Sequence, residues 1–413
     1  SGGNYNVCIG DEAGTAITTA DSNVAVGYQA LATEDTLSES VAVGYRALAL
    51  QNADDSNGGK NVSVGFTAGE AITTGNRNTF VGHRAGLDVD TADGNVAVGG
   101  DALFTNTGGE SNTAIGFEAL RTADANSGFI ANTAVGAQSG KAITDGVFNV
   151  LIGAQAGLSL ASVNYNTAVG AFALDACSHG STTTAIGYAA LTSQDYGTTT
   201  TNTANTALGY TAGLYNTSGA GNTFLGAETG AGGTTATRLT TGIRNTIIGA
   251  FALMDSASAN NGNVIGNGVT GAGGFTTLGQ STDDIRAENG VATWNTVSDE
   301  RFKKDIVDST AGLSFIKALK PRTFKYKTRG ELPETFNAYK ADSTDVFKNT
   351  NTNHGFIAQE VKAAIDAESG LKDGFKLWGE RADGSQEIGE AALIPMLVKA
   401  IQELEARIAV LEG

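Results

Sequence analysis

The sequence predicts a mainly β protein, with a β-roll or β-solenoid of about 17-residue repeats at the N-terminal side. A small α+β domain that ends in a coiled-coil helix is expected to follow it. Three observations carry this prediction. A short glycine-terminated motif recurs through two thirds of the 413 residues, the composition changes sharply at Ser298, and apolar residues near the C-terminus alternate at spacings of three and four.

The recurring motif is Asn-(Thr/Val)-Ala-(Val/Ile/Leu)-Gly, and most of its copies are 17 residues apart. A step of this length is too short for a propeller blade or a helix pair, but it fits one coil of a solenoid with two short strands and two turns. Degenerate copies end at Gly266 and Gly279. The clear copies end at Gly10, Gly27, Gly44, Gly65, Gly82, Gly99, Gly116, Gly136, Gly153, Gly170, Gly187, Gly209, Gly226 and Gly249.

Each motif position has a structural interpretation. The residue before the glycine is always Val, Ile or Leu and the residue two earlier is usually Val or Thr, so both point to one face of a short strand. The residue between them is mostly Ala or Ser, which makes that face a candidate for packing against sister chains. The leading asparagines, such as Asn61, Asn78 and Asn95, are expected to stack into a ladder along the solenoid.

A second marker lies four residues past each motif glycine, where Gly and Leu alternate with a superperiod of four repeats. Inserted loops at 51–59, 123–129 and 195–203 follow the second Leu copy of a set, and a fourth insertion at 232–240 is out of phase. We expect these loops to project from one side of the solenoid.

The composition divides the chain into residues 1–279, a connector at 280–297 and a domain at 298–413. Residues 1–297 carry 9 Lys and Arg against 24 Asp and Glu, whereas residues 298–413 carry 17 against 19. A short strand is expected near 291–294. The acidic repeats argue against nucleic acid as a partner. No apolar run reaches the ~18 residues of a membrane span, which predicts no membrane insertion.

No cofactor and no metal site is expected. His83 and His179 lack partner ligands at suitable spacing, and the acidic residues at 88, 90 and 93 lack the remainder of a calcium loop. The repeats offer no carboxylate pair for hydrolysing a polysaccharide. The chain opens at Ser1 rather than Met, so a fragment or processed product of a longer protein is expected.

At the junction, Ser298-Asp299-Glu300 before Arg301 has the composition of a helix N-terminus, which by itself favours a capping role over chemistry. A helix is expected over 312–321 before Pro321, a strand over 323–327, a helix from about 354–361 and a long final helix over 390–411.

This order of elements strongly resembles the C-terminal intramolecular chaperone domain of phage endosialidases, tail spikes and tail fibres, an autoproteolytic serine peptidase family. The motifs that carry the resemblance are Ser-Asp-x-Arg-x-Lys-Lys-Asp-Ile at 298–306 and Gly-Phe-Ile-Ala-Gln-Glu-Val at 355–361. The preceding repeats resemble the head β-roll of trimeric autotransporter adhesins.

The resemblance implies a Ser-Lys dyad in which Ser298 is the nucleophile and Lys303 the general base. The implied cleavage is in the peptide bond between Val297 and Ser298. A lysine loses its proton near neutral pH only when it is desolvated or crowded by cations. The expected supporting residues are Asp299, Arg301, Lys304 and His354.

The final helix, over 390–412, is expected to form a coiled coil. Its seam nominally favours two strands, whereas both resemblances imply three; a monomer core is the alternative. The seam residues are Ile394, Leu397, Ile401, Leu404, Ile408 and Leu411.

Together these features indicate a homotrimeric phage tail fibre in the virion, outside the host cell, whose chaperone domain cleaves itself off. Its expected partners are a host cell-surface glycan or protein receptor and other tail proteins on the N-terminal side of Ser1. No activity on other substrates is expected. The main alternative is a bacterial trimeric surface adhesin without proteolytic activity. An enzyme acting on host polysaccharide is a further alternative.

Overall fold

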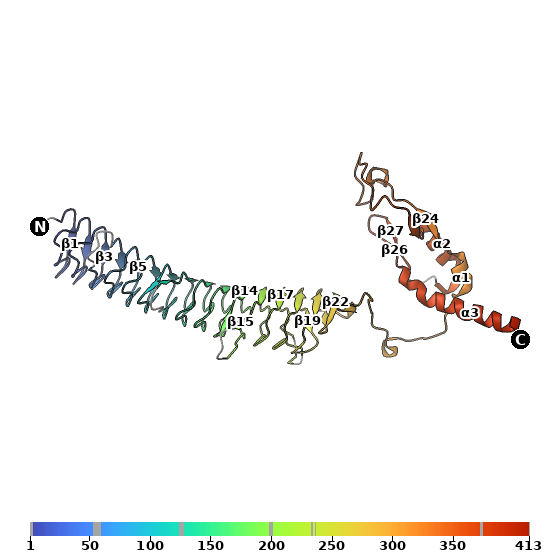
Figure 1. Cartoon of the computed structure of the whole chain (residues 1–413), viewed down its shortest axis with the longest axis horizontal. Helices are drawn as coiled ribbons and strands as arrows, with labels where there is room; N and C mark the ends of the chain where they lie inside the picture. Colours follow the sequence, from blue (N-terminus) through green and yellow to red (C-terminus); the bar gives the residue numbers. More distant parts are fainter. Residues whose placement is uncertain are drawn as a thin grey trace. The chain divides into compact units, whose positions relative to one another are not determined.

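The computed structural model describes residues 3–52, 59–123, 128–197, 201–232, 234–235, 237–371 and 375–412. The chain divides into two compact units, Ser1–Val297 and Ser298–Gly413, which are described separately (Figure 1).

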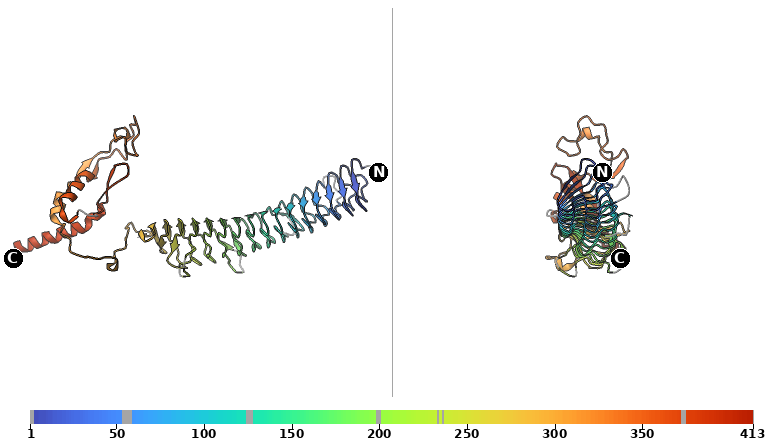
Figure 2. Two further views of the ribbon diagram at one scale, coloured as in Figure 1. Left: turned by 180° about the vertical axis from the view of Figure 1, so that it is seen from behind. Right: turned by 90° about the vertical axis from the view of Figure 1, so that its left-hand side faces the viewer.

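The first unit is a β-solenoid in which each coil contributes one short strand to a long parallel sheet (Figures 1 and 2). Each strand pairs in register with the same motif position of the next coil, for example Val24 with Val41. The predicted fold class is confirmed. The strands are β1 (Val7–Ile9), β2 (Val24–Val26), β3 (Val41–Val43), β4 (Val62–Val64), β5 (Thr79–Val81), β6 (Val96–Val98), β8 (Thr113–Ile115), β10 (Thr133–Val135), β11 (Val150–Ile152), β12 (Thr167–Val169), β14 (Thr184–Ile186), β16 (Thr206–Leu208), β17 (Thr223–Leu225), β18 (Thr246–Ile248) and β20 (Asn263–Ile265).

The expected second strand of each coil is present only in some coils of the described chain, because most coils return through a series of tight turns. The second strands pair as β7 (Gly109–Glu110) with β9 (Gly128–Phe129), β13 (Gly180–Ser181) with β15 (Thr201–Asn202), and β19 (Leu253–Met254) with β21 (Thr270–Gly271). The tips of the four inserted loops, at 53–58, 124–127, 198–200 and positions 233 and 236, lie outside the described residues.

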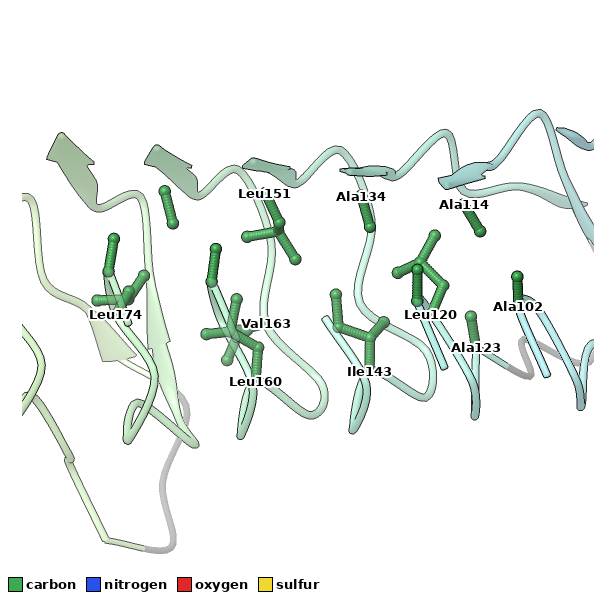
Figure 3. Packing of buried hydrophobic residues seen from close by; sticks show 14 of the residues in the cluster. Ala102, Ala114, Leu120, Ala123, Ala134, Ile143, Leu151, Leu160, Val163 and Leu174 are labelled. Carbon is green, nitrogen blue, oxygen red and sulfur yellow. The ribbon is translucent and has the colours of Figure 1, made fainter. Parts of the chain in front are cut away.

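The small residue in the middle of each strand points into the coil. Ala25, Ala114 and Ala134 are fully buried, whereas their Val, Ile and Thr neighbours on the same strands are half-exposed or exposed. Figure 3 shows Ala114, Ala134 and Leu151 facing Leu120, Ile143 and Leu160 across the narrow interior. The expectation that the Ala/Ser face packs against sister chains is therefore wrong, since the coil's own turns cover it.

Large core residues explain the Gly/Leu superperiod. Phe80 takes the strand-middle position of β5, and its ring fills the space beside Gly69 and Gly86. A Cβ atom on Gly86 would lie 2.7 Å from that ring, closer than real Cβ contacts. Leu151 and Phe224 are placed in the same way between glycine pairs. The coils with Leu at the marker have Ala in the strand, except the coil of Leu253, which has Ile247. The core volume is thus shared between the two sides of the coil.

The predicted asparagine ladder is confirmed. Each amide oxygen accepts a hydrogen bond from the backbone N–H of the next ladder position, as in Asn78 to Asn61 at 2.8 Å. The amide nitrogens donate to backbone carbonyls, as Asn78 does to Ala92; the exception is Asn166, whose amide nitrogen has no partner among the described residues. Two coils have Ser40 or Thr183 at this position, and the side chains of Gln51 and Gln194 take over the missing amide contacts.

The C-terminal end of the solenoid is closed by a hairpin of β22 (Phe275–Gln280) and β23 (Asp283–Glu288). The short strand expected near 291–294 is wrong: these residues form no strand, and only the following Asn295 makes a single bridge, with Arg286. The alternation in 283–288 was the available signal for the second hairpin strand.

The second unit is a small α+β fold around Phe315, Val361, Leu377 and Leu393. Helices form near the expected positions, but the expected strand at 323–327 is shorter. The elements are η1 (Glu300–Phe302), α1 (Leu313–Ala318), β24 (Arg322–Phe324), η2 (Arg329–Glu331), β25 (Asn353–Gly355), α2 (Ala358–Ala367), η3 (Ser369–Leu371), β26 (Trp378–Glu380), β27 (Gln386–Ile388), η4 (Glu390–Leu393) and α3 (Ile394–Glu412).

Candidate functional site

Ser298 and Lys303 are brought together at the start of the second unit. The Nζ atom of Lys303 lies 2.7 Å from the Oγ atom of Ser298 and donates a hydrogen bond to it. The short 3-10 helix η1 lies between them and turns the backbone, so that residues five positions apart come into contact. The turn ends where the Lys303 amide donates a hydrogen bond to the Glu300 carbonyl. The geometry suits a hydroxyl nucleophile and an amine base, which need hydrogen-bond contact.

Asp299 rather than Ser298 caps the short helix. Its carboxylate accepts a hydrogen bond from the Arg301 backbone N–H at 2.9 Å, so the serine hydroxyl is not consumed as a cap. The guanidinium of Arg301 also binds Asp299 at 2.6 Å. This guanidinium, together with the backbone amide, holds the pKa of the Asp299 carboxyl below its usual range. Consequently the Arg301 cation is engaged in an ion pair rather than directed at Lys303.

His354 lies on β25, where its Nδ1 atom is 3.3 Å from the hydroxyl of Thr323 on β24. Lys304 follows η1 and is exposed, as are Ser298 and Lys303. In the isolated chain the dyad is therefore surrounded by solvent, and the desolvation that an amine base needs has to come from further protein.

Helix α3 has two distinct faces. Met396 and Ala400 are buried against the domain, and the carboxylate of Glu403 accepts a hydrogen bond from the Leu313 amide at the start of α1. The neighbouring face, about 100° around the helix, carries the predicted seam, all of it exposed: Ile394, Leu397, Ile401, Leu404, Ile408 and Leu411. The helix is thus anchored on its own domain through one face, while the described residues of the second unit leave the apolar seam uncovered.

The solenoid carries a further exposed feature that was not predicted from the sequence. The rings of Tyr28, Tyr45, Phe66 and His83 stack in a column with centroids 5.1 to 5.4 Å apart. All four directly follow a motif glycine, and this position was the available signal. The column borders the exposed Val, Ile and Leu residues of the strands.

Neither a membrane-spanning helix nor a metal-binding group was found in the described ranges. Every helix there is too short or too polar to cross a bilayer, and no three His, Cys, Asp or Glu side chains among these residues converge as ligands. The ring of His83 stacks on Phe66, and the Nδ1 atom of His179 is 2.7 Å from the hydroxyl of Ser178.

Comparison with known families gives a match within the second unit. Residues 298–370 match the family model described as the chaperone of endosialidase. The match begins at the serine of the dyad and includes none of the repeats. No curated protein and no solved structure matches the chain.

Proposed function

We propose, from the match of residues 298–370 to the family model described as the chaperone of endosialidase, that the chain is a phage tail fibre or tail spike with a self-removing chaperone. The second unit gathers three chains and aligns their solenoids. It then leaves by cleavage at Ser298, and the repeat rod remains to attach the virion to its host. The observation that carries the proposal is the 2.7 Å contact between Lys303 and Ser298 at the first residue of the family match.

The proposed cleavage is an acyl transfer followed by hydrolysis. Lys303, in its neutral form, takes the proton of the Ser298 hydroxyl as Oγ attacks the carbonyl carbon of Val297. The bond from that carbon to the Ser298 nitrogen breaks, the nitrogen takes up the proton, and an ester forms on Oγ. Water then hydrolyses the ester, which releases a carboxylate at Val297 and a free α-amine on Ser298.

Trimer assembly supplies the control in this scheme. In one chain the dyad is exposed and solvent surrounds its lysine, whereas an amine base needs to be shielded from water. Packing of three second units through the exposed α3 seam would exclude water from the junction. Cleavage then follows assembly rather than preceding it, and the released rod is kinetically trapped.

The outward strand face is the surface that we assign to inter-chain packing in the solenoid. It carries a continuous row of half-exposed aliphatic residues, such as Val26, Ile152 and Leu208. The alanines that alternate with them on the strands point into the coil instead. An apolar surface of this length on a soluble protein calls for a partner. Host attachment is assigned to the inserted loops, since binding residues concentrate on loops carried by a rigid scaffold.

Gel electrophoresis of purified protein tests the proposal. The wild type should yield pieces of about 30 and 12 kDa, at about 0.1 kDa per residue, whereas Ser298→Ala and Lys303→Ala should stay whole. Ser314→Ala and Lys317→Ala are matched controls on α1 and should cleave normally. Equal fragmentation of Ser298→Ala would remove the dyad. An uncleaved wild-type trimer would instead favour the adhesin alternative.

A further inference from the structure

Two columns of side chains flank the outward strand face of the solenoid. The glycine-side column consists of the residues that directly follow each motif glycine. The asparagine-side column consists of the residues that directly precede each ladder position; in every coil this residue has a positive φ, such as 57° at Phe148 and 60° at Tyr165. The shared backbone conformation shows that the positions are equivalent from coil to coil.

In the nine coils that carry a Phe or Tyr ring in one of the two columns, the other column of the same coil carries no ring. The remaining coils do not show this pattern; they include Arg77 with His83, Gly94 with Gly100, and Ala131 with Ala137. The glycine-side rings are Tyr28, Tyr45, Phe66, Phe117, Tyr188 and Tyr210. The asparagine-side residues of the same coils carry no ring: they are Ser22, Glu39, Lys60, Ser111, Thr182 and Ala204. Where the asparagine side carries a ring, at Tyr5, Phe148 and Tyr165, the glycine side has Asp11, Ala154 and Ala171.

Contact within one chain does not account for this pattern. The two column residues of a coil are six positions apart, and the strand between them is extended, which places them about 15–20 Å apart. Within the chain the rings instead stack along each column, as Tyr188 does on Tyr210 and Phe148 on Tyr165. The complementarity between columns therefore needs a second chain.

We propose that in the trimer the glycine-side column of one chain packs against the asparagine-side column of its neighbour, coil by coil, and that the alternation of rings and small residues fixes the register. The inference rests on the trimer proposed above. In a closed three-fold ring every interface is heterologous, so one flank of a chain meets the opposite flank of the next at the same height.

The strand face alone discriminates poorly between registers, because every coil offers the same aliphatic pattern. The two columns do discriminate between registers, because their residues differ from coil to coil. In register, Tyr165 meets Ala171 and Phe66 meets Lys60, a cation–π pair. A shift of one coil brings Tyr165 against Tyr188, ring against ring, and in the opposite shift Thr182 meets Ala171 and leaves a gap.

The observations favour a second copy of the chain over a host sugar as the occupant of these columns. A sugar stacks on the face of an aromatic ring, but the faces of Tyr45 and Phe66 cover each other at 5.1 Å with planes 8° apart. Tyr45 and Phe66 are nevertheless 44% and 49% exposed. At roughly 100 Å² of exposed ring surface each, six rings offer ~600 Å². Together with the strand face this exceeds the ~800 Å² per partner of a standard interface.

Disulfide trapping tests the proposed contact on the full chain in a Cys8→Ser background. The pair Ala131→Cys with Ala137→Cys occupies the two columns of one coil. The control pair, Ala131→Cys with Ala171→Cys, is offset by two coils, or ~10 Å. A disulfide needs Cα atoms within ~7 Å, so neither pair can close within a chain. Oxidation should yield covalently linked trimers from the first pair alone.

A double-mutant cycle tests the register code. Ala171→Tyr should lower the melting temperature of the trimer, and adding Tyr165→Ala should restore part of the loss, because the ring then has room. The same Tyr165→Ala paired with Ala250→Tyr, in another coil, should give additive losses.

The outcomes separate the two proposals. Trimers by light scattering without crosslinks from the first pair would overturn the column contact and leave the tail-fibre proposal intact. Equal crosslinking of both pairs, or strict additivity at 165 and 171, would overturn the register code. A monomer would remove the trimer, and this inference with it.

Discussion

Replacing one asparagine of the ladder by alanine should strongly lower the free energy of unfolding of the coils around it. Asn149 is fully buried, its amide nitrogen donates to the Val163 carbonyl at 2.8 Å, and its oxygen accepts from the Asn166 backbone N–H at 3.0 Å. Asn149→Ala leaves both backbone groups buried without a partner. Each orphaned group costs about 1–3 kcal/mol, so the variant should lose about 2–6 kcal/mol per chain.

Two coils of the solenoid have Ser or Thr in place of the ladder asparagine, and in both of them another side chain makes the missing hydrogen bonds. In the two coils whose ladder position is Ser40 or Thr183, a buried glutamine amide replaces the missing contacts, with Gln194 donating to Thr183 at 3.0 Å. The coil of Asn149 has Leu160 at the corresponding position and cannot substitute in this way.

Hydrogen exchange measured by mass spectrometry is the suitable assay, because stability in a repeat array is local. The Asn166 amide should exchange at least about thirtyfold faster in Asn149→Ala, since 1.4 kcal/mol corresponds to a factor of ten. Asn267→Ala, at an exposed asparagine, is the matched control. The ladder argument would be refuted if the two variants exchanged alike in the coils around Asn166.

Three further predictions concern other parts of the chain. Burial raises the pKa of Glu34, so its folded form holds the proton more tightly, and its contribution to stability is present below an ordinary pKa of ~4.3 and declines as pH rises through the raised value. Glu34→Gln should flatten this decline in melting temperature against pH, and an unchanged slope would contradict the assignment. Ile401→Lys should give monomers by light scattering, because it places charge in the α3 seam, whereas Gln402→Lys on the exposed helix surface should leave trimers; equal behaviour of the two would argue against the seam. Burial raises the pKa of Cys177 to about 11, so iodoacetamide at neutral pH should alkylate the exposed Cys8 and leave Cys177 unmodified until the solenoid unfolds, as read by mass spectrometry of the peptides.

Much of the architecture follows from local sequence. The 17-residue step sets one coil, because each copy supplies a strand and a glycine turn, and the asparagine position requires an amide that both donates and accepts along the stack. The contact between Ser298 and Lys303 could also be predicted from the sequence, because one short turn brings together residues five positions apart.

Tertiary structure decided which strand face is inside. Alternation shows that the faces of Val24-Ala25-Val26 differ, but it does not say which one the coil covers. The interior is narrow, and side chains from the strand and from the opposite turn fill it together. An alanine of the strand is therefore buried where a Leu faces it, and a Phe is buried where two glycines leave space. The aliphatic side chains are left outside, and the surface available to sister chains follows from that packing, which no single repeat contains.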